Sequence, residues 1–328
     1  MIRLPCFYYP TTALFVDDHK GFLTAIKSRL PDNLPVKLFN EPIKALTTIK
    51  NQKMPTFKDQ KTIQFVDHES DITDQSLIGL HYEIFSSMAF DIQRFATYSV
   101  VIVDHMMPDL DGISFCRELK DHPIKKIMLT GNSDHELAVQ AFNDGLIDYY
   151  LSKDSPNLIT QLNLKIQILQ KAYFESEIER SIGLLLNPTS LINDVSSLAF
   201  YEKIKEELKA TEFYLLDRWG SMLFLDRNGV PTTLAITPAE TLDAFSKIAE
   251  DHDETKISCS LSNREQILFF PNQEDHMRPA NEWDSFLHEA NPFPGRNDFF
   301  YSIISNSSFH PTNLTKIKSQ NNYMEISP

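Results

Sequence analysis

The sequence has few cysteines and no long apolar run, and both absences exclude classes of protein. Only Cys6, Cys116 and Cys259 occur among 328 residues. Their odd number and wide separation argue against a disulfide framework or a thiolate zinc site. No apolar run approaches the roughly 20 residues of a membrane-spanning helix, and the first residues lack the features of a secretory signal. We therefore expect a cytosolic, and so cytoplasmic, protein that has no membrane partner.

Positive charge is also scarce. The sequence has 31 Lys and Arg residues and 45 Asp and Glu residues, which gives a net charge of −14 and a pI near 5.1. Because proteins bind nucleic acids largely by neutralising phosphates with Lys and Arg, a nucleic-acid partner is not expected. The length and the hydrophobic content of 42% fit two compact domains.

Strands and helices alternate in the first half of the chain. Apolar runs of strand type occur at 12–16, 35–39, 98–104, 126–130 and 147–152. Segments with helical spacing of apolar residues cover 19–30, 41–50, 111–121 and 134–144. This alternation predicts an α/β domain with a doubly wound, parallel, five-stranded sheet.

Polar side chains follow four of these strands. Asp17 and Asp18 come after the first strand, Asp104 ends the third, Thr130 ends the fourth and Lys153 follows the fifth. In parallel sheets, ligands and reactive groups collect beyond the carboxyl ends of the strands. We therefore expect three carboxylates, a hydroxyl and an ammonium group at one edge of the sheet. Three close carboxylates repel one another, and a divalent cation such as Mg²⁺ would remove that repulsion.

These motifs resemble the CheY-like receiver domain of two-component response regulators. The matching residues are the acidic pair, "VDHMMPDLDG" around Asp104, "LTG" at 129–131, and Lys153 after Tyr149 and Tyr150. The resemblance implies that Asp104 accepts a phosphoryl group from a sensor histidine kinase in a Mg²⁺-dependent reaction. It further implies that Asp18 binds the metal directly, that Asp17 acts largely through water, and that Asp104 and the backbone carbonyl of Met106 complete the protein ligands. No other cofactor is expected.

The resemblance also assigns the remaining site residues. Lys153 and the Thr130 hydroxyl are the expected contacts of the bound phosphoryl group. Inward movement of Thr130, coupled to rotation of Tyr150, is the expected switch. An apolar Met106 and Asn132, two residues after Asp104 and Thr130, predict slow loss of the phosphoryl group because Met106 would orient an attacking water poorly.

Three features need separate interpretation. The family usually has proline after the lysine, but Asp154 follows Lys153 here. His105, beside Asp104, is a lone histidine and is expected to be a surface or packing residue rather than a metal ligand. The acidic pair and Asp104 lie roughly 40 residues further apart than the family pattern, so residues 53–95 are expected to form an ordered insertion between the second helix and the third strand, with a helix over 74–95.

The remaining sequence predicts a linker and a second domain. We expect the receiver domain over 1–155, an extended helix over 156–184 that favours a homodimer, and a smaller α+β output domain over 185–328. The output domain has a helix over 193–209, a three-stranded antiparallel meander over 212–237, a strand over 265–270 and a helix over 281–290. Asp217, Arg218 and Asp226 at its hairpin turns could line a ligand site but are expected to be solvated turn residues.

The sequence as a whole predicts a response regulator of a phosphorelay whose output domain binds a protein or a small ligand, and which is not an enzyme on an external substrate. The insertion and the acidic, meander-type output resemble response regulators of the LqsR quorum-sensing type. Two alternatives stay open. The output domain could be a phosphorylation-controlled enzyme acting on a nucleotide or small metabolite, or the protein could be a DNA-binding transcriptional regulator, although the sequence shows no basic recognition helix.

Overall fold

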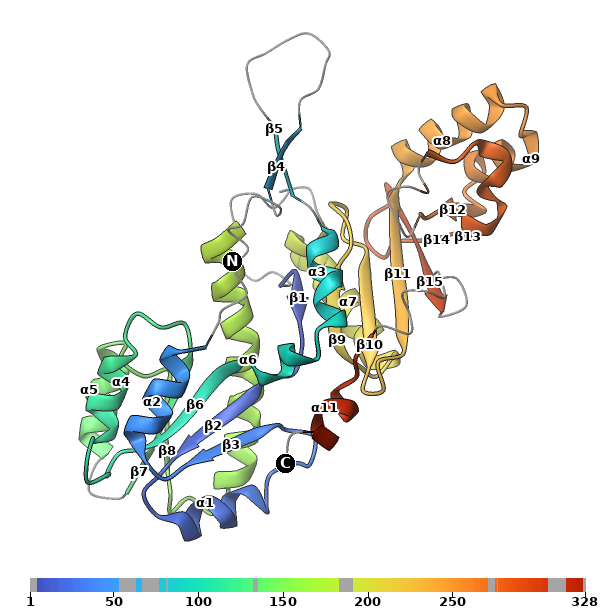
Figure 1. Ribbon diagram of the computed structural model, residues 1–328. Coiled ribbons are helices and arrows are strands. Elements are labelled where there is room, and N and C mark those ends of the chain that lie inside the picture. The colour runs from blue at the N-terminus through green and yellow to red at the C-terminus, as the bar shows by residue number, and fades with distance from the viewer. Residues whose placement is uncertain are drawn as a thin grey trace. The chain divides into compact units, whose positions relative to one another are not determined.

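The chain folds into two compact units (Figure 1). The structure, a computed structural model, describes residues 5–52, 63–66, 77–80, 82–131, 135–182, 191–270, 275, 277–305 and 317–326. The parallel-sheet unit comprises Tyr9–Asp59, Gln93–Gly183 and Tyr323–Pro328, and the antiparallel-sheet unit comprises Met1–Tyr8, Gln60–Ile92 and Leu184–Asn322. None of the described helices combines the length and the apolar character that spanning a membrane requires.

The parallel-sheet unit contains five strands in the order β3-β2-β6-β7-β8, all parallel. The strands are β2 (Thr12–Val16), β3 (Val36–Phe39), β6 (Tyr98–Asp104), β7 (Lys125–Thr130) and β8 (Tyr149–Ser152). The helices are α1 (Lys20–Lys27), α2 (Pro42–Lys50), α4 (Gly112–Glu118), α5 (His135–Asn143) and α6 (Leu158–Ile182). Most residues of the 3-10 helix η2 (Ile92–Ala96) and of α11 (Gln320–Ile326) also belong to this unit.

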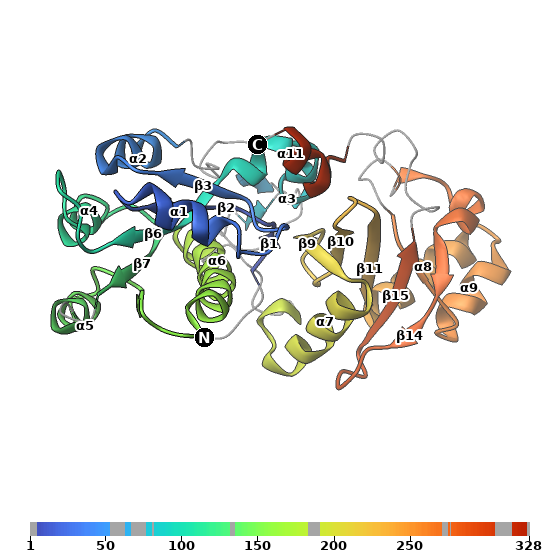
Figure 2. The same ribbon diagram turned by 90° about the horizontal axis from the view of Figure 1, so that it is seen from below.

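Helices cover both faces of this sheet, with α2, α4 and α5 on one face and α1 and α6 on the other (Figure 2). Alternate residues of each strand enter the two cores. Along β6, Val101 and Val103 pack beneath α2, α4 and α5, whereas Val100 and Ile102 pack against α1 and α6. Because both faces are buried at the centre of the sheet, β2 and β6 consist mostly of apolar residues.

The antiparallel-sheet unit is built on a six-stranded sheet in the order β1-β9-β10-β11-β15-β14. Its strands are β1 (Phe7–Tyr8), β9 (Ala210–Leu215), β10 (Met222–Asp226), β11 (Pro231–Pro238), β14 (Asn291–Pro292) and β15 (Phe299–Ser305). Two two-stranded sheets accompany it: β4 (Ile63–Val66) with β5 (Leu77–Leu80), and β12 (Gln266–Leu268) with β13 (Leu287–Glu289). The α-helices are α3 (Glu83–Ser87), α7 (Val195–Glu207), α8 (Ala239–Asp251) and α9 (Thr255–Ser262), and the 3-10 helices are η1 (Met88–Phe90), η3 (Leu191–Asn193) and η5 (Ala280–Phe286).

Helices α8 and α9 form a core with β12, η5 and β15. The buried residues there include Leu242, Leu261, Ile267, Trp283 and Ile304. Phe200 of α7 meets Phe293 and Tyr301 edge to face, with ring centroids 4.7 and 4.9 Å apart. Aromatic pairs in this geometry each add about 0.5–1.5 kcal/mol beyond the area that they bury.

The predicted fold class is confirmed in both units. The five receiver strands and the meander of β9, β10 and β11 lie where the sequence predicts them. Two predicted helices are wrong in part. Among the described residues of the segment 74–95, Leu77–Leu80 form β5, which pairs with β4, and the α-helical part is Glu83–Ser87. Gly79 disfavours a helix there, and a short apolar run does not distinguish a helix from a strand. In 281–290, a 3-10 helix is followed by β13.

The units also divide the chain differently from the expected domain boundaries. Residues 60–92 of the insertion and the N-terminal strand β1 belong to the antiparallel-sheet unit, and the whole of α6 belongs to the parallel-sheet unit. With these additions the antiparallel-sheet unit is the longer of the two, whereas the sequence predicts a smaller second domain.

Candidate functional site

Three carboxylates converge at the carboxyl edge of the parallel sheet. Asp17 and Asp18 follow β2, Asp104 ends β6, and one ligand atom from each lies within 4.8 Å of the others. Strands β2 and β6 are neighbours at the centre of the sheet, where successive crossovers leave in opposite directions. Doubly wound sheets place their ligand sites at this point. Asp17 and Asp104 are buried, whereas Asp18 is exposed.

Lys153 lies between the two buried carboxylates. Its Nζ atom is 2.6 Å from Asp17 Oδ2 and 2.9 Å from Asp104 Oδ1. Its ammonium group also lies 4.5 Å from the ring centroid of Phe22, on α1. Burial works to lower the pKa of Lys153, but its hydrogen bonds to Asp17 and Asp104 and their charges leave that pKa raised. Lys153 therefore stays protonated and neutralises part of the acidic site.

The carboxyl group of Asp104 titrates above its usual range. Burial is the largest cause of its raised pKa, and the charge of Asp17 adds to it. The hydrogen bond and the charge of Lys153, followed by a hydrogen bond from the Met106 backbone, oppose this rise without cancelling it. A buried carboxylate that is partly uncompensated attracts further positive charge, and a metal ion would supply it.

The loop after Asp104 is held close to the end of β6. Asp111 caps α4, because its Oδ1 atom accepts a hydrogen bond of 2.9 Å from the Ser114 N–H. The Gly112 N–H donates a 2.9 Å hydrogen bond to the His105 carbonyl oxygen. A β-carbon at Gly112 would collide with the Asp104 carbonyl oxygen and crowd His105. The Asp-Gly pair therefore allows the first turn of α4 to pack directly against the backbone of Asp104 and His105.

His105 is buried, as expected for a packing residue. Its Nδ1 atom has no hydrogen-bond partner within the described part of the chain. It is not among the residues whose ligand atoms converge, in a search limited to the described residues.

The remaining predicted site residues lie at the same edge but make other contacts. The Thr130 hydroxyl donates a 3.4 Å hydrogen bond to the carbonyl oxygen of Leu151 on β8. The Tyr150 ring lies 6.1 Å from the Phe142 ring of α5, in an edge-to-face arrangement. The side chain of Met106 is 65% exposed, and Asn132 lies outside the described residues. The side chain of Asp154 is exposed, and no peptide bond is cis where the structure describes the backbone.

Phe22 is a site contact that the sequence did not identify. Its helical spacing predicts a buried position on α1, and it does pack on the core beside α6. The cation–π contact with Lys153 depends on where α1 begins. His19 caps that helix, with its Nδ1 atom accepting a 2.9 Å hydrogen bond from the Phe22 N–H. No local pattern near Lys153 reveals this contact, because the two residues are far apart along the chain.

The acidic site suits a hard divalent cation. Carboxylate oxygens are the ligands that Mg²⁺ prefers, and one exposed and two buried carboxylates within reach of one another leave room for water ligands. Asp17, Asp18 and Asp104 would hold such an ion.

The acidic residues at the turns of the antiparallel-sheet unit have local roles. Asp217 Oδ1 accepts hydrogen bonds of 2.9–3.0 Å from the backbone N–H groups of Trp219, Gly220 and Ser221. Asp226 Oδ1 accepts hydrogen bonds of 2.8 Å from those of Asn228 and Val230. These two carboxylates hold hairpin turns, as the sequence predicts, but both are half-buried rather than fully solvated. Burial raises the pKa of Asp217.

Comparisons with known proteins agree with this geometry. Residues 86–163 match the family model of the response regulator receiver domain. The probable transcriptional regulator ycf27 of Guillardia theta is 33% identical over 162 residues, which are 48% of this chain and 59% of that protein. Regulatory protein AtoC of Escherichia coli (strain K12) is 35% identical over 77 residues, which are 22% of this chain and 17% of that protein. The chain thus spans less than two thirds of the length of these curated relatives.

One solved structure matches along nearly the whole chain. The Legionella pneumophila response regulator LqsR superposes with a TM-score of 0.79 at 29% identity, and the match covers 98% of this chain and 95% of that one. The family model begins at residue 86, within the insertion, whereas the structure adds β2 and β3 to the same sheet and α1 and α2 to its two faces. The parallel-sheet unit is therefore a response regulator receiver domain, in a chain that is similar to the response regulator LqsR over almost its full length.

Proposed function

We propose that this protein is a phosphorylation-dependent switch that receives a phosphoryl group on Asp104 from a sensor histidine kinase. One observation carries the proposal: Asp17, Asp18 and Asp104 lie within 4.8 Å of one another, and the Lys153 ammonium is 2.9 Å from Asp104. A carboxylate that only capped the following helix would not need the other two carboxylates or the ammonium group beside it.

The reaction that we propose is a direct transfer. An Asp104 carboxylate oxygen attacks the phosphorus atom, the P–N bond of the phosphohistidine breaks, and the histidine nitrogen keeps the electron pair of that bond. The product is an acyl phosphate on Asp104. Lys153 would contact the phosphoryl oxygens once they arrive, since its Nζ atom already lies beside Asp104. Bound Mg²⁺, held by Asp17, Asp18, Asp104 and the Met106 carbonyl, would neutralise charge on the phosphoryl oxygens.

The switch would begin at Thr130. Its hydroxyl donates to Leu151, and a 3.4 Å bond is long and easily replaced. A phosphoryl group on Asp104 would offer strong acceptor oxygens instead. Movement of Thr130 toward them would leave space for the Tyr150 ring, which contacts Phe142 of α5. The surface of α5 and β8 would then change with phosphorylation.

That surface is the proposed dimer interface. Leu137 and Phe142 of α5 and Leu164 and Ile168 of α6 have exposed fractions of 45–53%. The two helices flank the edge strand β8 from opposite faces of the sheet, and exposed apolar side chains on both favour association with a second copy. We expect Leu164→Glu to prevent dimerisation without preventing phosphorylation.

We propose that the output acts by binding a protein or a small ligand, and that the protein is not an enzyme on an external substrate. Its similarity to LqsR favours a role in quorum sensing. The rival enzyme function would need an enclosed pocket with perturbed catalytic groups in the antiparallel-sheet unit. The rival DNA-binding function is supported by similarity to a probable transcriptional regulator and a regulatory protein, which covers only part of either chain. The net charge of −14 opposes it.

The experiment incubates the full chain with Mg²⁺ and acetyl phosphate, and follows intact mass and sedimentation. Wild type should gain the mass of one phosphoryl group and form dimers. Asp104→Asn should do neither, and Asp109→Asn, an exposed carboxylate in the same loop, should behave as wild type. A wild type that gains no mass, or an Asp104→Asn variant that does, would refute the proposal. The exposed Met106 predicts a phosphoryl lifetime of minutes or longer, and a lifetime of seconds would contradict that part.

A further inference from the structure

Strand β15 has one fully paired edge and one edge that is mostly open. It pairs with β11 along its whole length, from Phe299 opposite Pro238 to Ser305 opposite Thr232. On its other edge, β14 pairs only with Phe300 and Tyr301. Beyond Tyr301, no strand that the structure describes lies against this edge.

The open edge presents backbone hydrogen-bonding groups. The Phe299 carbonyl oxygen accepts a 2.9 Å hydrogen bond from the Phe293 N–H, so Phe299 directs its backbone groups away from β11. Backbone groups alternate between the two sides of an antiparallel strand. Tyr301, Ile303 and Ser305 therefore share the orientation of Phe299, and the N–H and C=O groups of Ile303 and Ser305 face the open side.

The neighbouring strand leaves β15 at a defined residue. If β14 extended by two more residues from Asn291 toward the N-terminus, in the same register, Glu289 would lie opposite Ile303. Instead, β13 pairs with β12, and the Ala290 N–H donates a 3.0 Å hydrogen bond to the Glu265 carbonyl oxygen. The departure leaves a groove of about 490 Å³ beside β15, which is lined by His288, Glu289, Asn291 and residues 301–305.

The shape and chemistry of the groove select its occupant. Because β13 forms its opposite wall, a single extended strand fits better than the edge of a second sheet. The Ile303 side chain is 44% exposed, so an apolar side chain opposite it would bury apolar surface. Glu289 is exposed at the rim of the groove, and the chain carries a net charge of −14, so a basic segment is favoured.

We propose that this groove binds an extended, basic segment of a partner protein, which adds as a short strand antiparallel to β15 and places an apolar side chain opposite Ile303. Main-chain hydrogen bonds to Ile303 and Ser305 provide affinity, and the side-chain contacts provide specificity. The proposal gives the output partner a binding surface without depending on phosphorylation of Asp104.

The first test measures amide hydrogen exchange in the dilute full-length protein. The Ser302 and Ile304 amides, which face β11, should exchange slowly, and the Ile303 and Ser305 amides should exchange fast. Slow exchange at Ile303 and Ser305 would show that the chain already covers this edge, and protection that appears only at high concentration would identify a second copy as the occupant. Either result would overturn the proposal.

The second test selects ligands for the full-length protein, without a phosphodonor, from a displayed library of random twelve-residue peptides. Enriched peptides should carry β-branched and basic residues and protect the Ile303 and Ser305 amides. They should bind Ile303→Pro at least tenfold more weakly, because proline removes the edge-facing N–H but leaves the hydrogen bonds to β11. Ile303→Val should bind as wild type.

Thermal unfolding and slow exchange of the Ser302 and Ile304 amides, which face β11, check that the variants fold. If Ile303→Pro does not fold, the test instead uses wild-type protein and enriched peptides that carry N-methyl groups at alternate residues. These methylated peptides should bind at least tenfold more weakly than the unmodified peptides. No enrichment on wild type, or equal binding of the variant or the methylated peptides, would overturn the proposal. Because no phosphodonor is present, this failure would be separate from failure of the proposed phosphotransfer.

Discussion

The Lys153 ammonium group stabilises a site that would otherwise repel itself. It lies 2.6 Å from one buried carboxylate and 2.9 Å from another. Two like charges about 4 Å apart repel by roughly 4 kcal/mol at an effective dielectric constant of 20. Lys153 and a divalent cation would both relieve this repulsion, so each should matter more when the other is absent.

Replacing Lys153 with Met should therefore make stability depend on pH and on Mg²⁺. Without the ammonium group, the pKa of Asp104, which burial already raises, should rise further. A carboxyl whose pKa is higher in the folded than in the unfolded state destabilises the fold once it ionises, so stability is lost as pH rises. Melting curves without divalent cations should show a loss on the order of 3 kcal/mol at neutral pH, less loss near pH 5, and recovery with Mg²⁺.

The matched control is Lys165→Met, whose ammonium group lies 3.9 Å from the ring centroid of Tyr149. That variant should follow wild type at every pH. Parallel pH profiles for Lys153→Met and wild type would contradict a neutralising role for Lys153.

Gly112 is required by packing rather than by backbone freedom. A β-carbon there would collide with the Asp104 carbonyl oxygen, so Gly112→Ala should displace either α4 or the end of β6. We expect a loss of about 1–3 kcal/mol of stability and a roughly 10- to 100-fold slower phosphorylation by acetyl phosphate. Unfolding in urea and intact mass measure the two effects. Gly21→Ala, where the added carbon would meet only the His19 ring, should change neither by much.

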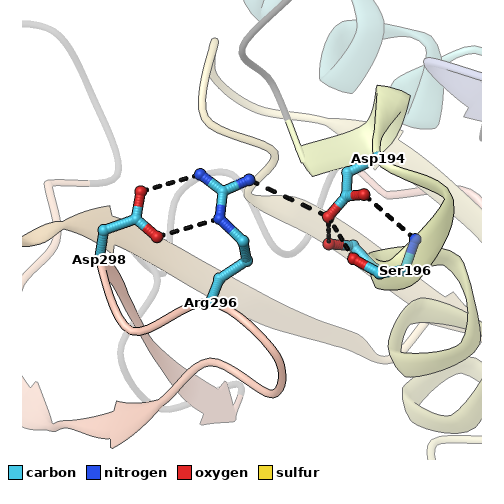
Figure 3. Close-up of polar contacts among 5 residues, drawn as sticks. Asp194, Ser196, Arg296 and Asp298 are labelled. Carbon is cyan, nitrogen blue, oxygen red and sulfur yellow. Dashed lines mark hydrogen bonds and ion pairs between the residues drawn. The ribbon is translucent and has the colours of Figure 1, made fainter.

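At the scale of elements, a small polar cluster anchors the start of α7 (Figure 3). Asp194 caps the helix, accepting hydrogen bonds from the Ser196 N–H at 3.1 Å and from the Ser196 and Ser197 hydroxyls at 2.6 and 2.8 Å. Arg296, in the loop before β15, forms a two-pronged pair with Asp298 at 2.8 and 3.0 Å and lies 4.0 Å from Asp194. The cluster ties α7 to the loop between β14 and β15.

The N-cap hydrogen bonds of Asp194 should contribute more to the stability of the protein than its charge does. Asp194→Ala should cost about 1 kcal/mol, seen as a melting temperature roughly 2–4 °C lower, whereas Asp194→Asn keeps an N-capping oxygen and should cost little. The Ser196 and Ser197 hydroxyls and the Arg296 charge lower the pKa of Asp194. The stabilisation is therefore present above about pH 4 and is lost as pH falls further. Equal losses in both variants would assign the effect to charge.

The sequence predicts elements well where one residue pattern suffices. Strands β2, β6 and β7 are apolar on both faces. Asp17 and Asp18 follow β2, and Asp104 ends β6, so the same sequence pattern predicts both the strands and the site. Strand β1 has only two residues, too few for any periodicity. Strand β15, Phe299–Ser305, is apolar enough to be a strand, but its place beside β11 depends on a pairing across 61 or more residues of chain, which no local pattern encodes.

At the scale of the whole molecule, the chain enters each unit more than once. The first strand belongs to the antiparallel sheet, where Phe7 pairs with Tyr214 of β9 and stacks on Phe85 with ring centroids 5.7 Å apart. Residues 60–92 return to that unit before the receiver sheet is complete. A sequence pattern assigns a segment to an element, but it does not say which of two cores the element joins.

Phe7→Ala should therefore destabilise the antiparallel-sheet unit and spare the receiver. Phe7 is 1% exposed, and truncating a buried phenylalanine costs about 3–5 kcal/mol. Amide exchange should accelerate in β9 and β10 while acetyl phosphate still phosphorylates Asp104. Leu14→Ala, in the receiver core, should show the reverse pattern. Loss of phosphorylation in Phe7→Ala, with unchanged exchange in β9, would contradict this assignment of the N-terminus.

The interleaved path of the chain also bears on how such a protein could diversify. A single recombination crossover within residues 9–183 would leave pieces of both units on each side of the junction. A new output could not be acquired by joining one foreign gene segment to an intact receiver. We expect the two units to be inherited as a pair, and sensor specificity and output to change by substitution rather than by shuffling.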